Sequence, residues 1–185
     1  MTPNFAGTLT AEGLDLIDVE QYFNLEYRAN YQEWLENLSD LEESEIKQLD
    51  RIKTHFAYLS KRPMLEEIVK MVVISPLLDM AGFYDPPFHT TAEQSINLSV
   101  PDKEIVVKGK IDVFVIQEQL WVLVIEAKRS RFSLEPAIPQ ALAYMVANPK
   151  NHHCYGLVTN GSNFIFIKLN KGLIIDIKSG FFIDN

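Results

Sequence analysis

The spacing of apolar residues changes along the chain from a helical period to the alternation typical of strands. It predicts helical segments up to about residue 82, a loop at 83–93, an antiparallel run of strands, one further helix and then more strands. The main helices are expected at about 42–59, 64–80 and 133–148, and the strands at about 94–100, 104–109, 110–117, 120–128, 154–159, 163–169 and 173–177. This order indicates an α/β (α+β) fold with a mixed sheet flanked by helices.

The chain is expected to divide into a helical N-terminal extension, residues 1–60, and a domain formed by residues 61–185. Aromatic residues follow the helical spacing in the extension, among them Tyr22, Tyr31 and Trp34. The plainer interpretation of this acidic extension is a solvated helical face. The alternatives are that it docks a partner or screens the basic site, or that its aromatic residues form a homodimer contact.

The candidate chemistry lies in the segment 110–144, where three polar residues separate two apolar, strand-like runs. Such a short connection favours a hairpin. Asp112 stands near the start of the first run and Glu126 near the end of the second, so the hairpin places them opposite each other or one position apart. Residues two apart in a strand share a face, so Lys128 points the same way as Glu126.

Two carboxylates at this separation repel each other unless a cation lies between them. Mg²⁺ and Mn²⁺ prefer carboxylate and carbonyl oxygens as ligands. Asp112 and Glu126 are therefore candidate metal ligands, and Lys128 is a candidate for stabilising charge on a phosphate or orienting a water molecule. The plainer interpretation is a solvated ion pair at a strand end.

A helix follows the hairpin and carries Gln140 and Tyr144 at positions i and i+4, hence on one face. The Asp, the Glu-x-Lys and the Gln-x-x-x-Tyr together resemble the PD-(D/E)xK nuclease superfamily, which has the restriction-endonuclease-like fold. The upstream segment LEEIVKMVVISPLLDMAGF (65–83) is similar to the opening helix of the N-terminal nuclease domain in the motor (R) subunits of type I restriction enzymes.

In that helix a Glu precedes a Pro-Leu-Leu turn, and the spacing here matches Glu66, with Glu67 as the alternative. The resemblance covers roughly residues 60–168. It departs from the superfamily pattern at Ile111, where a proline commonly precedes the Asp.

The resemblance implies a metal centre and an enzyme. Asp112, Glu126 and the backbone carbonyl of Ala127 would bind Mg²⁺ or Mn²⁺. Lys128 would be catalytic and Glu66 would be a supporting acid. The implied activity is a divalent-metal-dependent deoxyribonuclease, either endonuclease or exonuclease, related to restriction or defence.

The same resemblance implies that Gln140 and Tyr144 orient the site or the nucleic acid. Arg129 and Arg131 add positive charge beside the lysine and are expected to contact DNA. No Gly-x-x-x-x-Gly-Lys motif occurs, so no nucleotide motor is encoded here. A motor or specificity subunit would have to be another chain.

The net charge of −8 argues against nucleic-acid binding, because DNA-binding domains usually carry a basic surface. The distribution weakens this objection. Residues 1–50 contain twelve acidic and two basic residues, a net charge of −10, whereas residues 51–185 carry +2. The single cysteine, Cys154, suits a reducing cytoplasm, and no apolar run approaches the length of a membrane span.

Two further functions remain open from the sequence. One is a catalytically silent nuclease-fold module that binds nucleic acid or a partner protein, which the acidic charge favours. The other is a structural assembly domain that dimerises through its aromatic N-terminal residues.

Overall fold

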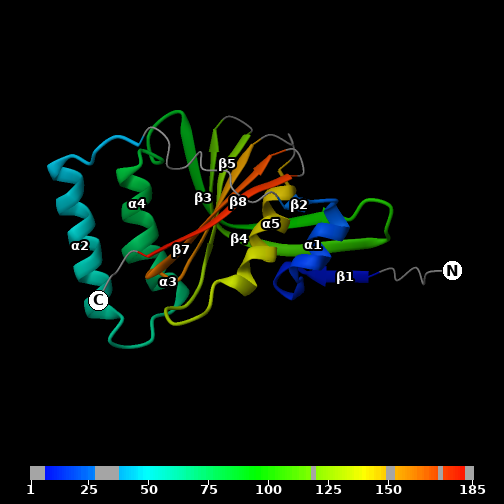
Figure 1. Ribbon diagram of the computed structural model, residues 1–185, viewed down its shortest axis with the longest axis horizontal. Coiled ribbons are helices and arrows are strands. Elements are labelled where there is room, and N and C mark those ends of the chain that lie inside the picture. Colours follow the sequence, from blue (N-terminus) through cyan, green and yellow to red (C-terminus); the bar gives the residue numbers. More distant parts are fainter. Residues whose placement is uncertain (1–6, 28–37, 118–119, 149–152, 171–172, 182–185) are drawn as a thin grey trace.

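The computed structural model describes residues 7–27, 38–117, 120–148, 153–170 and 173–181 (Figure 1). The helical elements are η1 (Ala11–Gly13), α1 (Leu16–Phe23), α2 (Glu43–Leu59), α3 (Glu66–Val69), η3 (Lys70–Ile74), α4 (Ser75–Met80), η4 (Glu135–Ala137) and α5 (Ile138–Val146). The strands are β1 (Gly7–Thr10), β2 (Glu26–Tyr27), β3 (Phe88–Ser99), β4 (Ile105–Gln117), β5 (Leu120–Ala127), β6 (Cys154–Thr159), β7 (Asn163–Asn170) and β8 (Leu173–Phe181). None of the helices in these ranges is long and apolar enough to cross a membrane.

The strands form one mixed sheet in the order β1-β4-β5-β6-β7-β8-β2, with β3 also paired to β4. Three pairings are parallel: β1 with β4, β5 with β6, and β2 with β8. The other pairs are antiparallel hairpins or close neighbours in sequence. The helix η4–α5 lies between β5 and β6, as expected for a crossover that joins parallel strands.

The long strand β4 organises the sheet. One edge of β4 pairs with β3 along almost its whole length. The other edge pairs with β1 at Ile105–Lys108 and with β5 at Val113–Gln117. The residues between these two stretches, 109–112, lie where β1 ends and where β5 diverges.

Helices cover both faces of the sheet, α2 and α3–α4 on one face and α1 and α5 on the other (Figure 1). The first core lies under α5, whose residues from Ala141 to Met145 are all at most 1% exposed. The second core lies under α2 and α3–α4 and includes Phe56, Val69 and Val73. Burial of apolar side chains on both faces at roughly 25 cal/mol per Å² is the main stabilising contribution.

The segment Glu66–Met80 is one continuous helix with a π-helical turn, η3, in its middle. Pro76 lies in the first turn of α4, and the preceding turn is the π-helical one. A proline lacks an N–H donor, so a helix that contains one needs local rearrangement of its hydrogen bonds. The helix ends near Gly82, which has φ 74° as is typical of a residue that terminates a helix.

The predicted class, a mixed sheet flanked by helices as in the restriction-endonuclease-like fold, is confirmed. Two details differ. Residues 88–93 were expected in a loop but belong to β3, and the two strands expected at 104–117 are the single strand β4. The N-terminal extension, expected to be helical, also differs: residues 7–27 contain the strands β1 and β2, which pair with β4 and β8, and the helix α1, which packs on the first core. The division of the chain at residue 60 stays a prediction, and Tyr31 and Trp34 lie outside the described residues.

Candidate active site

Asp112 and Glu126 lie opposite each other where β4 and β5 separate. The pairing of Val113 with Ile125 fixes the register, and one step further along both strands it brings Asp112 to face Glu126. Asp112 Oδ2 accepts a hydrogen bond of 2.7 Å from the backbone N–H of Ala127. A side chain of β4 therefore holds β5 at the point where backbone pairing ends.

Lys128 binds the second carboxylate. Its Nζ lies 2.6 Å from Glu126 Oε1 and 3.0 Å from Gln140 Oε1. The backbone N–H of Lys128 donates to the carbonyl of Thr159 in β6 at 2.7 Å, which fixes the residue just beyond the end of β5. Lys128 therefore lies beside Glu126, as their spacing along the strand predicts.

Gln140 and Tyr144 continue this network from α5. An ammonium group only donates hydrogen bonds, so the Gln140 oxygen faces Lys128, and Gln140 Nε2 donates to the Tyr144 hydroxyl at 2.8 Å. The same hydroxyl accepts from the backbone N–H of Lys110 at 3.3 Å. Both side chains are buried, Gln140 at 3% and Tyr144 at 1% exposed. Residues of α5 therefore hold the Lys128 side chain in its orientation.

A glycine makes room for the tyrosine. A Cβ atom at Gly109 would lie 2.5 Å from Tyr144 Cε1 and 2.8 Å from its hydroxyl oxygen. Real Cβ atoms do not approach other atoms so closely, so only glycine lets the ring lie against β4 here. Gly109 lies in the stretch of β4 between the residues that pair with β1 and those that pair with β5.

An open cleft of about 500 Å³ gives access to this network and is lined by Glu66, Lys128, Arg129 and Gln140, among others. Glu66 is half-buried, whereas Glu67 is exposed. Arg131 does not line this cleft; it lines a neighbouring one together with Ser130 and Asn160. The cleft is thus lined by four of the expected residues, whereas Arg131 and the two facing carboxylates, Asp112 and Glu126, are not among its lining residues.

The carboxylates are close enough to change each other's ionisation. Burial, repulsion from Asp112 and a smaller effect of Glu66 raise the pKa of Glu126 to about 8, although Lys128 opposes the shift. Burial also raises the pKa of Glu66, with Lys128 opposing and Asp112 adding to the increase. Burial alone would lower the pKa of Lys128, but Glu126, Glu66 and Asp112 outweigh it and raise this pKa.

One carboxylate oxygen of the site lacks a hydrogen-bond partner among the described residues. Glu126 is 3% exposed, and its Oε2 has no hydrogen-bond partner among the described residues. A buried acceptor without a partner is costly, and a cation would relieve both this cost and the repulsion between Asp112 and Glu126. The oxygen donors present therefore fit a hard divalent cation.

The described part of the chain contains no cluster of three or more Asp, Glu, His or Cys side chains arranged to hold a metal. A metal here would take the two facing carboxylates and complete its shell with backbone oxygen or water, as Mg²⁺ commonly does. The carbonyl of Ala127 was expected to be such a ligand; what the structure shows of Ala127 is its N–H bond to Asp112. The metal-binding roles stay predictions.

Two residues of this site were not anticipated from the sequence. Lys70 Nζ lies 2.8 Å from Glu93 Oε1 and 3.1 Å from Asp112 Oδ1. Glu93 also forms an ion pair with Lys110. One signal could have revealed Lys70: it lies four residues after Glu66, so both side chains leave the same face of the helix.

The ion pairs of Glu93 shift the pKa values of both Lys70 and Glu93. Burial would lower the pKa of Lys70, but hydrogen bonds and attraction from Glu93 and Asp112 raise it to about 12. Hydrogen bonds from Lys110 and Lys70 lower the pKa of Glu93 to about 2. The helix therefore places the Glu66 carboxyl group near Lys128 and the Lys70 ammonium group beside Asp112.

No known family description matches the sequence, and a comparison with curated proteins finds no relative. Among solved structures, the chain is similar to a fragment described as "a putative HsdR subunit of a type I restriction enzyme" from Vibrio vulnificus YJ016. The identity is 17% and the TM-score 0.46, over 63% of this chain and 23% of that one. At this similarity the match adds nothing to what the geometry of the site indicates.

Proposed function

We propose that this protein is a divalent-metal-dependent deoxyribonuclease of the PD-(D/E)xK type. The observation that carries the proposal is the pair of facing carboxylates, Asp112 and Glu126, in which Glu126 Oε2 is buried and has no hydrogen-bond partner in the part of the chain that the structure describes. Lys128 binds the other oxygen of Glu126 and lines the cleft. A carboxylate pair with an unsatisfied oxygen can hold a metal ion, and a cationic side chain beside it can stabilise charge on a phosphate, which together suit metal-assisted phosphodiester hydrolysis.

Asp112 and Glu126, with the carbonyl of Ala127, would hold Mg²⁺ or Mn²⁺, which would supply Lewis acidity toward a phosphate and lower the pKa of a bound water. The remaining chemistry belongs to the chain itself. Lys128 presents a fixed positive charge toward a phosphate in the cleft. Gln140 holds that charge in place, and Tyr144 holds Gln140.

Glu66 completes the site as a supporting acid, since it lines the same cleft and its raised pKa makes it a weaker acid than usual. A carboxylate with a raised pKa is a stronger base than usual, so it can accept a proton from a water molecule in the cleft and return it. Arg129, on the rim of the cleft, is proposed to contact the DNA backbone, and Arg131 to extend this contact along the neighbouring cleft.

DNA as substrate is supported by the local charge and not by the charge of the whole chain. The net charge of residues 51–185 is +2, Lys70 pairs with Asp112, and Lys128 and Arg129 line the cleft. A restriction or defence role, with a motor or specificity subunit on another chain and a cytoplasmic setting, is part of the same proposal.

The test is cleavage of supercoiled, linear and single-stranded DNA with Mg²⁺, with Mn²⁺ and with a chelator. We expect metal-dependent cleavage by the wild type that is lost in Asp112→Asn, Glu126→Gln and Lys128→Ala. Lys47→Ala is a matched control, because Lys47 ends another Glu-x-Lys string but lies exposed on α2 and pairs with Glu43. Unchanged cleavage by the Asp112 or Lys128 variant would reject the mechanism.

A second function, a catalytically silent module that binds DNA or a partner protein, is favoured by one observation. Both Asp112 oxygens are already hydrogen-bonded, to Lys70 and to the Ala127 N–H. An Asp112 that serves only to hold the fold would look the same. Binding of DNA at low salt by a folded protein that cleaves none of these substrates with either metal would establish this alternative.

A further inference from the structure

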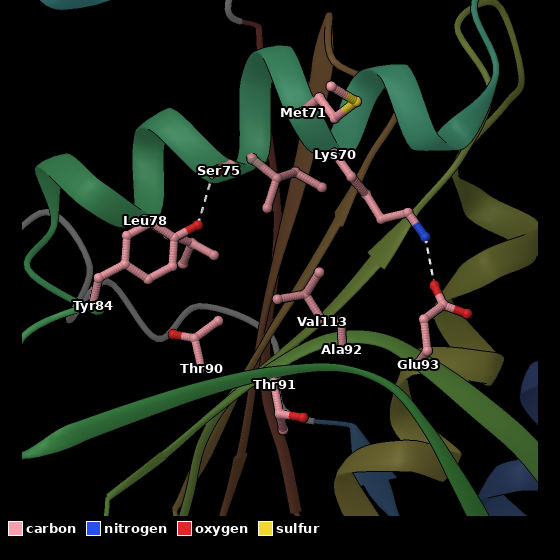
Figure 2. Close-up of a pocket in the computed structure, with 11 residues that line it drawn as sticks. Lys70, Met71, Ser75, Leu78, Tyr84, Thr90, Thr91, Ala92, Glu93 and Val113 are labelled. Carbon is pink, nitrogen blue, oxygen red and sulfur yellow. Dashed lines mark hydrogen bonds and ion pairs between the residues drawn. The ribbon is translucent and has the colours of Figure 1, made fainter.

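Lys70 reaches from the helix across to two carboxylates on neighbouring strands. Figure 2 shows its side chain extending from the helix to the Glu93 carboxylate, with Nζ–Oε1 at 2.8 Å. The same Nζ lies 3.1 Å from Asp112 Oδ1. The side chains of Lys70 and Asp112 are 17% and 15% exposed, so water screens this contact little.

The backbone is irregular at both ends of this contact. The π-helical turn begins at Lys70, and such turns are rare and occur often at functional sites. In β3, Glu93 lies opposite Asp112 between the pairs Ala92–Val113 and Gln94–Ile111, and it adopts φ 58°. A left-handed conformation is uncommon for glutamate and costs energy, which the ion pairs of its side chain help to offset.

The Lys70 ammonium group is bonded to the Asp112 oxygen that a metal ion would need as a ligand. Asp112 Oδ2 accepts from the Ala127 N–H, and Oδ1 faces Lys70. A divalent cation approaching Oδ1 would meet the positive charge of Lys70 and be repelled by it. Metal binding at Asp112 therefore requires the ammonium to withdraw.

The structure provides a place for it to go. Lys70 and Glu93 both line an open hollow of about 460 Å³ between the helix and β3 (Figure 2). The walls also include Met71, Thr91 and Val113. A lysine stem has several rotatable bonds, so Nζ can leave Asp112 for this hollow while it keeps its ion pair with Glu93.

We propose that Lys70 is a positioning residue that serves as the resident counter-ion of Asp112 and gives way, held by Glu93, when a divalent cation binds. This role rests on the proposed function and extends it. Without metal, Lys70 neutralises Asp112 and keeps the carboxylate aligned with β5. With metal, it stays beside the site as a second positive charge.

The experiment is calorimetric titration of Mn²⁺ into the wild type, Lys70→Met, Lys70→Arg and Lys110→Met at one pH and ionic strength. Lys110→Met is the matched control, because it removes the same charge from the same Glu93 but has no ion pair with Asp112. We expect Lys70→Met to bind Mn²⁺ about tenfold more tightly than the wild type, from the loss of one close repulsion. Lys70→Arg should restore the wild-type affinity, and Lys110→Met should change it by at most about threefold.

Equal affinity of Lys70→Met and Lys110→Met, or no binding by either, overturns the counter-ion role. A role of Lys70 in the fold alone would weaken binding in Lys70→Met or leave it unchanged, so the direction of the change is informative. Cleavage assays separate the two proposals. If the wild type cleaves DNA with metal but Lys70→Met gains no affinity for Mn²⁺, only the counter-ion role is rejected. If Lys70→Met gains affinity for Mn²⁺ but neither the wild type nor any of the variants cleaves DNA, only the hydrolytic function is rejected.

Discussion

Asp112 takes the place of a backbone acceptor for the amide of Ala127. The N–H groups along a strand point alternately to its two neighbours, and the N–H of Lys128 donates to Thr159 in β6. The N–H of Ala127 therefore points toward β4, where it meets Asp112 Oδ2 at 2.7 Å. The carboxylate proposed to bind metal is thus also a structural part of the sheet.

Two substitutions at this position should separate its roles. Asp112→Ala removes the acceptor of the Ala127 N–H and a partner of Lys70, so we expect a loss of about 1–3 kcal/mol in the free energy of unfolding. Asp112→Asn keeps an oxygen acceptor and should lose less stability, while cleavage is lost in both. Denaturant unfolding checks this order, and equal stability of the two variants would show that the bond to Ala127 contributes little.

The raised pKa of Glu126 predicts how stability depends on pH. The folded-state pKa, about 8, lies above the ordinary value of 4.5, so the folded protein binds this proton more tightly than the unfolded chain does. Without metal, the contribution of Glu126 to stability is unaffected below about pH 4.5 and falls as the pH rises from there to about 8. Glu126→Gln removes this dependence.

We therefore expect Glu126→Gln to be more stable than the wild type at pH 7 by at most ~3 kcal/mol, with the difference vanishing near pH 4.5. Thermal unfolding of both proteins across this range, with a chelator present, measures the difference directly. Parallel stability curves would mean that Lys128 keeps Glu126 ionised at all these pH values. A gain in stability on removing a charged group is what a site adapted to bind a cation should show.

The Tyr144 hydroxyl is predicted to matter far more than an exposed tyrosine hydroxyl. Tyr144→Phe leaves the Lys110 N–H and Gln140 Nε2 without their common acceptor, which should cost about 1–3 kcal/mol of stability and reduce cleavage. Tyr84→Phe is the matched control: Tyr84 is 47% exposed and its hydroxyl donates to Ser75. It should change stability by less than ~0.5 kcal/mol. Similar small effects of both would show that Gln140 holds its position without Tyr144.

Cys154 gives a local probe of unfolding. It is the single cysteine of the chain and is buried, and burial raises the pKa of its thiol to about 12. Roughly one thiol in ten thousand is then ionised at pH 8, so the folded protein should react very slowly with a disulfide reagent. Reaction should become fast in denaturant, at the same midpoint as the loss of helix measured by circular dichroism. Fast reaction of the folded protein would mean that β6 opens locally.

The hairpin was predictable because its sequence carries strong local signals. Two apolar runs and a short polar connection predict the hairpin and bring Asp112 opposite Glu126 or one position from it. A β-bulge between Val115 and Ile116 sets the final register, in which Asp112 faces Glu126, and the sequence does not mark this bulge. The i, i+4 spacing likewise puts Gln140 and Tyr144 on one helix face, and they are hydrogen-bonded to each other. The hairpin and the pairing on the helix face follow from neighbours in sequence, whereas the bulge does not.

Other parts depend on partners distant in sequence. β3 is an edge strand in which Ile96 is the only fully buried residue, so apolar alternation does not mark it. β1 is mostly exposed and is ordered by its pairing with β4. The left-handed conformation of Glu93 has no signal in sequence, because glycine and asparagine, not glutamate, favour it. Lys70 was missed because its partner Asp112 is on another element.

The parallel pairings of the first two strands also constrain how the chain is made. β1 pairs with β4, which follows it by about a hundred residues, and β2 pairs Glu26 and Tyr27 with Leu173 and Ile174 of β8. During synthesis the N-terminal strands therefore leave the ribosome long before their partners exist. The order of contacts is strongly non-local, which slows folding and lengthens the time for which strand edges stay unpaired. A cell that makes this protein should benefit from chaperones that shield the nascent chain until β8 has emerged.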